Sequence, residues 1–408
     1  MKKWLTGFLM LVASAASGAS DKGSLVIAGG AISSNSVDIL TTFADLAGGT
    51  DARIGVVPAA TSSVDKQFKL LEQIFSAHGV PVEQVVLLPL AVKDDKDTEV
   101  DESSWKHNAK DRQLADAIAE LSAIWFIGGD QTLITQSLLN EDGSDTPVLK
   151  AMRTLYANGG TLGGTSAGAA IMSQLMIAGG NSQGALFEGF KQDFSSMNEQ
   201  EYGPVVTSRG LGFFTNGVID QHFDRKARLG RLIVTLLNDD ANIGYGVDEG
   251  SAMVVSGNGF QVIGESGVTV VDTRDVSDFK QGRYPLSVKG IRLSFVQSGD
   301  SYDMAAHQYY PRDGAAEVVG NEYFDVPAQH IAGILNANRD LDQFIGYNLL
   351  DNQATDTVHS WVRQNAQAKI NLIFTQDAQS QGYWSQDLTA DVYSFTNVRL
   401  DIVPMKGN

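Results

Sequence analysis

The sequence contains no cysteine, and this absence excludes several kinds of chemistry. A thiol nucleophile, a disulfide framework and a cysteine-ligated metal are all ruled out. The reactive groups must therefore be hydroxyl, imidazole, carboxylate or guanidinium groups. A chain of 408 residues, of which 43% are hydrophobic, can build a stable core without disulfides. We expect neither a metal nor another cofactor.

Basic residues and proline are also scarce. The formal net charge is −18, and no run of Lys and Arg is present. Such a surface repels a polyanion, so we predict no nucleic-acid partner. The same surface favours a cationic or guanidinium-bearing partner, although solubility in saline surroundings would equally explain the charge. Only 9 Pro accompany 42 Gly, which indicates many tight turns and close backbone approaches.

Long hydrophobic runs are missing after the first twenty residues. Lys2 and Lys3 precede a compact apolar run over residues 4–16, and Ser17 and Ala19 fit the small residues before a signal-peptide cleavage site. No later segment reaches the roughly 18–20 apolar residues of a membrane helix. We therefore predict a signal peptide over residues 1–19, export to the periplasm or the medium, and no membrane attachment after processing.

Short β-rich runs alternate with helical stretches in the first part of the chain. We predict strands at 25–28, 54–57, 85–88 and 124–127, helices at 66–77 and 113–121, and a charged surface loop at 92–110. This alternation predicts an α/β fold of three layers, α/β/α, with a mostly parallel central sheet.

The second part of the chain has a different character. We predict hairpin strands at 253–255, 261–263, 268–271 and 291–295, then a helix near 358–366 and strands at 370–374 and 398–403. We accordingly divide the chain into a catalytic domain at 20–304 and a C-terminal extension at 305–408. Covering a sheet edge, forming a homodimer interface and gripping an insoluble substrate are open alternatives for the extension.

The strongest local motif is Gly164-Thr165-Ser166-Ala167-Gly168. A Gly-x-Ser-x-Gly between a strand and a helix is typical of a nucleophile elbow, a turn so sharp that the flanking side chains must be nearly absent. We predict the following helix at residues 167–176, where its first N–H groups can stabilise an oxyanion. Ser166 is therefore the candidate nucleophile.

A catalytic serine needs a base, and His222 is the best placed histidine. It follows a predicted strand at residues 218–221, at the edge where open α/β sheets bind ligands. We interpret the other histidines as loop, capping or solvated residues: His78, His107, His307, His330 and His359.

The third group should be a carboxylate that orients the imidazole ring. Asp248 and Glu249 both follow an apolar stretch, and only one of two neighbours on an extended segment can face His222. The residues alone leave the two open. Asp220 is a competitor, but two positions before His222 on one strand it is poorly placed to reach the ring.

Two further motifs are candidates for substrate and oxyanion binding. Gly128 and Gly129 precede Asp130, and the N–H of Gly129 could complete an oxyanion hole with that of Ala167; a tight turn with Asp130 as a helix cap is the alternative. Arg228 and Arg231 are three residues apart, so they share a helix face and could bind a substrate carboxylate. An exposed charged helix face would look the same.

Four blocks occur in one order: Gly-Gly-Asp-Gln, Gly-Gly-Thr-Ser-Ala-Gly-Ala, Asp-Gln-His-Phe followed by Arg-x-x-Arg, and Asp-Glu-Gly-Ser-Ala. Together they closely resemble the cyanophycinase family over roughly residues 24–304. This is a serine peptidase family that also contains aspartyl dipeptidases and has the fold of class I glutamine amidotransferases.

The resemblance implies Ser166 as nucleophile and His222 as general base, and it favours Glu249 over Asp248. The substrate contacts that it implies are Gln131, Asp220, Gln221, Arg228 and Arg231. Lys226 stands where the family commonly has a third arginine, and lysine keeps the charge but loses the planar fork. That contact is in doubt unless Arg225 substitutes for it.

The implied substrate is cyanophycin, a poly-aspartate backbone with arginine attached to each side chain, and the implied product is the β-aspartyl-arginine dipeptide. One alternative is a peptidase that cleaves short peptides with an N-terminal aspartate. Another is a secreted polymer-binding protein without turnover, against which the intact Ser166, His222 and Glu249 count.

Overall fold

The structure is a computed structural model, and it describes residues 22–32, 36–191, 201–338, 340–365, 368–387 and 390–406. The predicted signal peptide at residues 1–19 lies outside the described residues. Within them, no helix is both long enough and apolar enough to cross a membrane.

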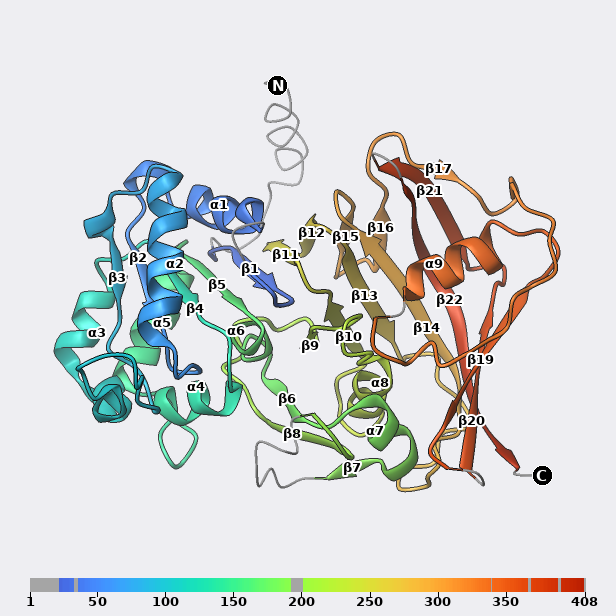
Figure 1. Ribbon diagram of the computed structural model, residues 1–408, viewed down its shortest axis with the longest axis horizontal. Coiled ribbons are helices and arrows are strands. Elements are labelled where there is room, and N and C mark those ends of the chain that lie inside the picture. The colour runs from blue at the N-terminus through green and yellow to red at the C-terminus, as the bar shows by residue number, and fades with distance from the viewer. Residues whose placement is uncertain are drawn as a thin grey trace.

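Two large sheets build the molecule; in Figure 1 the N-terminal strands of the first, in blue and cyan, lie in the left half, and the C-terminal strands of the second, in orange and red, lie in the right half. The first sheet has nine strands, in spatial order β16 (Gln308–Tyr310), β15 (Ser301–Asp303), β12 (Gly259–Gly264), β11 (Ser251–Ser256), β1 (Leu25–Ala28), β5 (Thr161–Thr165), β4 (Ala123–Phe126), β2 (Ile54–Val57) and β3 (Val85–Leu87). The five strands from β1 to β3 are parallel, and the other four continue the sheet in antiparallel pairs.

Helices cover both faces of the parallel part. On one face α1 (Val37–Leu46) and α2 (Val64–Ala77) bury Phe43 and Phe75 against strand residues such as Trp125. The opposite face packs against the remaining helices of this half: α3 (Arg112–Ile118), α4 (Gln131–Leu138), α5 (Pro147–Ala157) and α6 (Ala167–Ala170). Apart from the edge strand β3, the parallel strands are buried almost throughout, because apolar side chains leave them on both faces. The predicted α/β fold with a parallel core and helices on both faces is confirmed.

The second sheet is mostly antiparallel. Its spatial order is β18 (Ile331–Ala332), β19 (Thr357–Arg363), β20 (Ala368–Thr375), β22 (Ala390–Lys406), β14 (Val288–Gln297), β13 (Gly267–Asp272), β10 (Ile243–Val247) and β9 (Val218–Gln221), with β21 (Gln381–Asp387) and β17 (Ala316–Glu317) added beside β22. At one edge, β9 and β10 run parallel, with α7 (Ser182–Glu188) and α8 (Leu229–Leu237) nearby. A small third sheet holds β6 (Leu175–Gly179), β7 (Phe190–Lys191) and β8 (Val205–Arg209).

Strand pairing crosses residue 304 in both large sheets. In the first sheet β16 pairs with β15, and in the second β22 pairs with β14. Tyr309 of β16 also donates a hydrogen bond from its hydroxyl to Asp300 at 2.7 Å, and the same hydroxyl lies 2.5 Å from Ser394 of β22. The C-terminal extension is thus built into the same sheets as the region before it.

Three local predictions were wrong. The helix at 167–176 ends at Ala170, because residues from Leu175 on pair with β8 instead. The helix near 358–366 is strand β19, in which burial alternates with a period of two. The second half of the loop at 92–110 is a 3-10 helix, Glu102–Lys110, with Ala109 buried. The last helix, α9 (Leu341–Ile345), continues as a π-helical turn at Gly346–Leu350.

Candidate active site

Ser166 lies at a sharp turn between a strand of the first sheet and a helix. β5 ends at Thr165, Ser166 has φ 54° and ψ −110°, and α6 begins at Ala167. A positive φ is strained for a residue with a side chain. Gly164 and Gly168 approach so closely that a Cβ on Gly164 would lie 2.6 Å from the carbonyl oxygen of Gly168. The turn therefore has the geometry of a nucleophile elbow.

His222 follows β9 directly, at the edge strand of the second sheet, as the sequence predicts. Its Nε2 lies 2.8 Å from Oγ of Ser166. Its backbone N–H donates to the carbonyl oxygen of Gly29, at the end of β1, with a distance of 2.7 Å. The second sheet thus supplies the imidazole, and a backbone bond to the first sheet fixes its place beside the serine.

Glu249, and not Asp248, faces the imidazole ring. Oε1 of Glu249 lies 2.5 Å from Nδ1 of His222. Asp248 points the other way into the protein, where its carboxyl group accepts hydrogen bonds from the hydroxyl of Ser266 and the backbone N–H of Asp224. The turn after β10 therefore resolves the pair that the residues alone leave open.

The partners of His222 define which ring nitrogen carries the proton. An ionised Glu249 can only accept, so Nδ1 is the donor in that bond and Nε2 is left to accept the hydroxyl proton of Ser166. Burial lowers the pKa of His222 below its ordinary value, Arg228 and Lys226 lower it further, and Glu249 opposes them. The imidazole is therefore neutral at neutral pH, which is the form that a general base requires.

The two oxyanion-hole candidates lie on either side of Ser166. Ala167 is the first residue of α6, and the turn at Gly128 and Gly129 follows β4, the neighbour of β5. A Cβ on Gly128 would lie 3.1 Å from Cβ of Ser166. Among the described residues, neither the N–H of Ala167 nor that of Gly129 donates to a protein acceptor. Both N–H groups therefore remain candidates for the oxyanion hole.

Arg231 and Asp220 form a buried ion pair. Nε and Nη2 of Arg231 donate to the two carboxylate oxygens of Asp220 at 2.8 and 2.5 Å, and Nη1 donates to the carbonyl oxygen of Gly180. Both side chains are 2% exposed. Three nitrogens of the Arg231 guanidinium thus donate to protein acceptors, and the guanidinium neutralises the charge of Asp220. Contact of either side chain with substrate stays a prediction.

Arg228 lies at the start of α8, beside the same pair. Nη1 donates to the carbonyl oxygen of Gln221 at 2.6 Å and lies 3.8 Å from Asp220. Burial, together with the nearby Arg231, lowers the pKa of Arg228 to about 9. The predicted face shared by Arg228 and Arg231 is turned inward, so it is not an exposed charged surface.

The other predicted substrate contacts differ in whether the protein already binds their polar atoms. Nε2 of Gln131 donates to the carbonyl oxygens of Ile177 and Ala178, which fixes it against β6. Oε1 of Gln221 is buried and has no hydrogen-bond partner within the described ranges. Nζ of Lys226 lies 2.6 Å from Glu201, so its charge is already paired, whereas Nε of Arg225 lies 3.9 Å from the far oxygen of Glu249.

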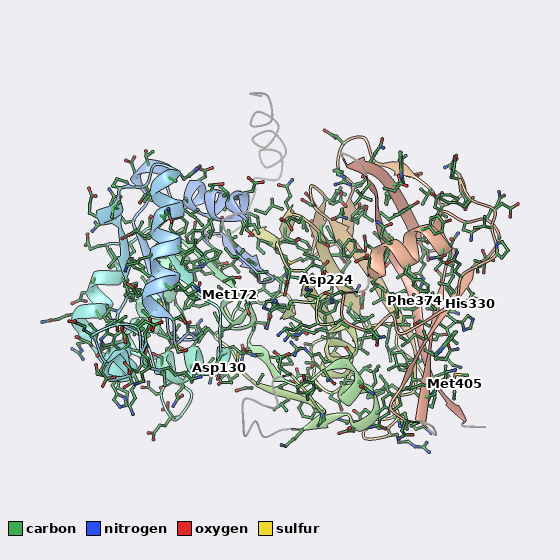
Figure 2. All side chains as sticks on the ribbon, in the orientation of Figure 1. Asp130, Met172, Asp224, His330, Phe374 and Met405 are labelled. Atoms are coloured by element: carbon green, nitrogen blue, oxygen red, sulfur yellow. The ribbon has the colours of Figure 1, made fainter. Side chains whose placement is uncertain are left out.

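Sequence reasoning missed two residues that hold the catalytic groups. A Cβ on Gly30 would lie 2.2 Å from the ring of His222, so the imidazole packs directly on this glycine. Asp224 accepts the backbone N–H of Glu249 at 3.3 Å, and it lies between the two halves of the molecule in Figure 2. The pair Gly29-Gly30 after the first strand was a usable signal for Gly30. No sequence pattern singles out Asp224.

In the part of the chain that the structure describes, no group of three or more His, Asp or Glu side chains is arranged to hold a metal ion. Of the other described histidines, Nε2 of His78 bonds Asp45 at 2.8 Å, and His330 packs against His359 in the C-terminal region.

Comparison with known proteins gives consistent matches. The model of peptidase family S51 matches residues 25–263. A cyanophycinase from Synechococcus elongatus is 34% identical over 277 residues, which cover 66% of this chain and 75% of the relative. A cyanophycinase from Geminocystis herdmanii is 31% identical over 299 residues, which cover 72% of this chain and 97% of the relative.

Among solved structures, a peptidase from an acI-B1 Actinobacterium aligns over 69% of this chain and 97% of its own length, with a TM-score of 0.46 and 18% identity. The family match spans more than half of this chain and includes Ser166, His222 and Glu249. The chain belongs to peptidase family S51 and is a serine-type peptidase.

Proposed function

We propose that this peptidase hydrolyses cyanophycin through an acyl-enzyme on Ser166 and releases β-aspartyl-arginine dipeptides. The observation that carries the proposal is the hydrogen-bonded series from Glu249 through His222 to Ser166, at 2.5 and 2.8 Å. The substrate is supported by the two relatives named cyanophycinase, one of which is covered almost completely.

The chemistry follows from the three side chains. Oγ of Ser166 attacks the backbone carbonyl carbon of the substrate while Nε2 of His222 takes the hydroxyl proton. The N–H groups of Ala167 and Gly129 stabilise the oxyanion, and Glu249 stabilises the imidazolium. His222 then protonates the leaving amine, and water, activated by the same imidazole, releases the acyl group.

Charge supports a guanidinium-bearing polymer. The net charge of −18 attracts such a polymer to the surface. Near the triad three basic residues, Lys226, Arg228 and Arg231, lie within one segment, where Lys226 is paired with Glu201 and Arg231 with Asp220. We propose that the unpaired Oε1 of Gln221 accepts a hydrogen bond from an N–H group of the substrate and that Arg228 meets a free carboxylate of the attached arginine residues.

Export is the second part of the proposal. It is supported by the basic start, the short apolar run and the small residues of positions 1–19. Expression of the full chain in a bacterial host, followed by N-terminal sequencing of the protein from periplasm and medium, tests it. A mature protein that begins at residue 20 supports export, and an uncleaved protein in the cytoplasm contradicts it.

The decisive experiment incubates the purified protein with cyanophycin and identifies the released products by mass spectrometry. We expect β-aspartyl-arginine from the wild type and none above background from Ser166→Ala. An inert wild type contradicts the substrate, and cleavage of short peptides with an N-terminal aspartate in its place supports the aspartyl dipeptidase alternative. Tight polymer binding without product supports a non-catalytic role.

A further inference from the structure

Two neighbouring loops carry the base and the orienting carboxylate. His222 starts the loop after β9, and Glu249 lies in the turn after β10. Backbone bonds hold both loops: Phe223 N–H donates to Val247 at 3.2 Å, and the N–H groups of His222 and Gly250 donate to Gly29 and Gly30 at 2.7 and 3.1 Å. The backbone N–H of Glu249 is not among these donors, and a side chain accepts it instead. The 2.5 Å contact between Glu249 and His222 therefore also depends on that side chain.

Two aspartates supply that support in a reciprocal arrangement. The backbone N–H of Glu249 donates to Oδ1 of Asp224 at 3.3 Å, and the backbone N–H of Asp224 donates to Oδ1 of Asp248 at 3.2 Å. Each aspartate thus accepts an N–H from the loop that carries the other. The hydroxyl of Ser266 donates to Oδ2 of Asp248 at 2.7 Å and anchors the pair to the segment before β13.

A cavity of about 40 Å³ lies beside this pair, and the C-terminal region contributes part of its lining. Its catalytic side includes Asp224, Asp248 and Arg228, and its opposite side includes Leu341 and Asp342 of α9. The space is large enough to hold water. The C-terminal extension therefore forms part of the wall behind the loops that hold His222 and Glu249.

Charged and polar groups face Asp224 and Asp248 from three parts of the fold. Asp340 and Asp342 face this pair from the C-terminal region, Arg228 from the start of α8, and the hydroxyls of Ser266 and Thr269 from the region of β13. Burial raises the pKa of Asp248 well above its usual range, and the carboxyl of Asp224 raises it further. Burial likewise raises the pKa of Asp224. Both shifts favour a protonated carboxyl on at least one of the two aspartates, and one bound proton removes the repulsion between their charges.

We infer that Asp224 and Asp248 are positioning residues that hold the turn of Glu249 against the loop of His222, with the C-terminal region as the backing wall. This inference rests on the proposed triad and adds the residues that hold Glu249 and His222 in place. The hydrogen bond that matters most is the one from the Glu249 N–H to Asp224, because it acts on the residue that orients the imidazole.

The test compares Asp224→Ala with Asp224→Asn, which retains the Oδ1 acceptor. The rate of sulfonylation of Ser166 by phenylmethylsulfonyl fluoride, followed by intact mass from pH 4 to 9, reports the base without needing any peptide substrate. We expect the alanine variant to react about 10- to 100-fold more slowly. The midpoint of its acid limb should move to lower pH, because His222 loses the carboxylate that raises its pKa.

Asp224→Asn should recover most of the rate and the wild-type midpoint. Asp300→Ala is the matched control, since Asp300 is also buried, also accepts backbone N–H groups and lies at the junction of the sheets. It should lower stability without moving the midpoint. If Asp224→Ala does not fold, Ser266→Ala removes only the donor to Asp248 and should give a smaller shift in the same direction.

An unmoved midpoint in a folded Asp224→Ala or Ser266→Ala variant overturns the inference, and so does an asparagine variant as slow as alanine. The proposed substrate fails separately, when the wild type is sulfonylated at Ser166 but does not cleave cyanophycin. Both proposals fail if the wild type is not sulfonylated at Ser166.

Discussion

The two large sheets contribute different parts of one catalytic series. The first sheet is parallel from β1 to its edge strand β3, and its strand β5 presents Ser166 through a local turn with close-packed glycines. The second sheet is mostly antiparallel, and its two parallel edge strands present His222 and Glu249. The nucleophile therefore depends on local backbone geometry, whereas its activation depends on how the two sheets meet.

The chain itself crosses between the sheets at the Glu249 turn. β10 belongs to the second sheet and β11, which follows after three intervening residues, to the first. Backbone bonds from His222 to Gly29 and from Gly250 to Gly30 fasten this crossing to the end of β1. Changes at the crossing should therefore affect activity more than stability, and changes at the distant sheet junction should do the reverse.

The largest effect is expected for Glu249→Gln. The amide keeps the size of the side chain, but it removes the charge that stabilises the imidazolium and allows the wrong ring tautomer. We expect kcat to fall about 10³- to 10⁴-fold, as for the equivalent carboxylate of other serine peptidases. Steady-state kinetics with a peptide substrate measures it, and circular dichroism checks the fold. A fall of less than tenfold would remove Glu249 from the triad.

The second largest effect is expected for Gly30→Ala. The new Cβ would lie 2.2 Å from the ring of His222, and φ at this position is +129°, so the imidazole must move. A shift of about 1 Å should cost roughly 10²-fold in kcat. Gly257→Ala is the matched control, because Gly257 also has a positive φ but no atom within 4 Å of the added Cβ. Equal losses of activity in both variants would contradict direct packing on the ring.

Tyr309→Phe tests the distant junction between the sheets. The hydroxyl donates to Asp300 and contacts Ser394, and the phenol is buried, so its removal should lower the free energy of unfolding by about 1–3 kcal/mol. Urea denaturation measures this. We expect kcat/KM to stay within about twofold of the wild type under folding conditions, because the triad is not touched. A large loss of activity without a loss of stability would contradict the separation of roles.

The smallest effect is expected for Asp342→Asn, behind the catalytic loops. Burial raises the pKa of Asp342 to about 6, above its value of about 3.9 in the unfolded chain, so ionisation opposes folding. The free energy of unfolding of the wild type should therefore fall as the pH rises from about 4 through 6, because the folded protein keeps a proton on Asp342 that the unfolded chain has lost. We expect the variant to be more stable by about 1–2 kcal/mol at pH 8 and equal to the wild type at pH 4. Urea midpoints at the two pH values measure the difference, and an equal gain at pH 4 would contradict this cause.

The sequence predicted the features that depend on local pattern. The strand before Ser166, the glycines around it and the strand-end position of His222 all leave a mark in neighbouring residues. It could not choose between Asp248 and Glu249, because that choice depends on which side of the turn faces the other loop. The family resemblance favoured Glu249 without supplying the geometry.

The sequence was least informative where partners are distant along the chain. The segment near 358–366 was predicted to be a helix, but pairing with β20 makes it a strand. The spacing of Arg228 and Arg231 predicted a shared face and did not reveal that Asp220 lies beneath it. Asp224 has no recognisable motif, since its partners are a backbone N–H and a carboxyl group on another loop.

The central claim is that a histidine of the second sheet activates the serine of the first. The most direct measurement is the rate at which phenylmethylsulfonyl fluoride labels the wild type and His222→Ala at pH 7.5, with the labelled residue mapped by peptide mass. The account predicts a single label at Ser166 in the wild type and a rate at least about 10³-fold lower in the variant. Labelling of the variant at the wild-type rate, or of a different serine in the wild type, would contradict it.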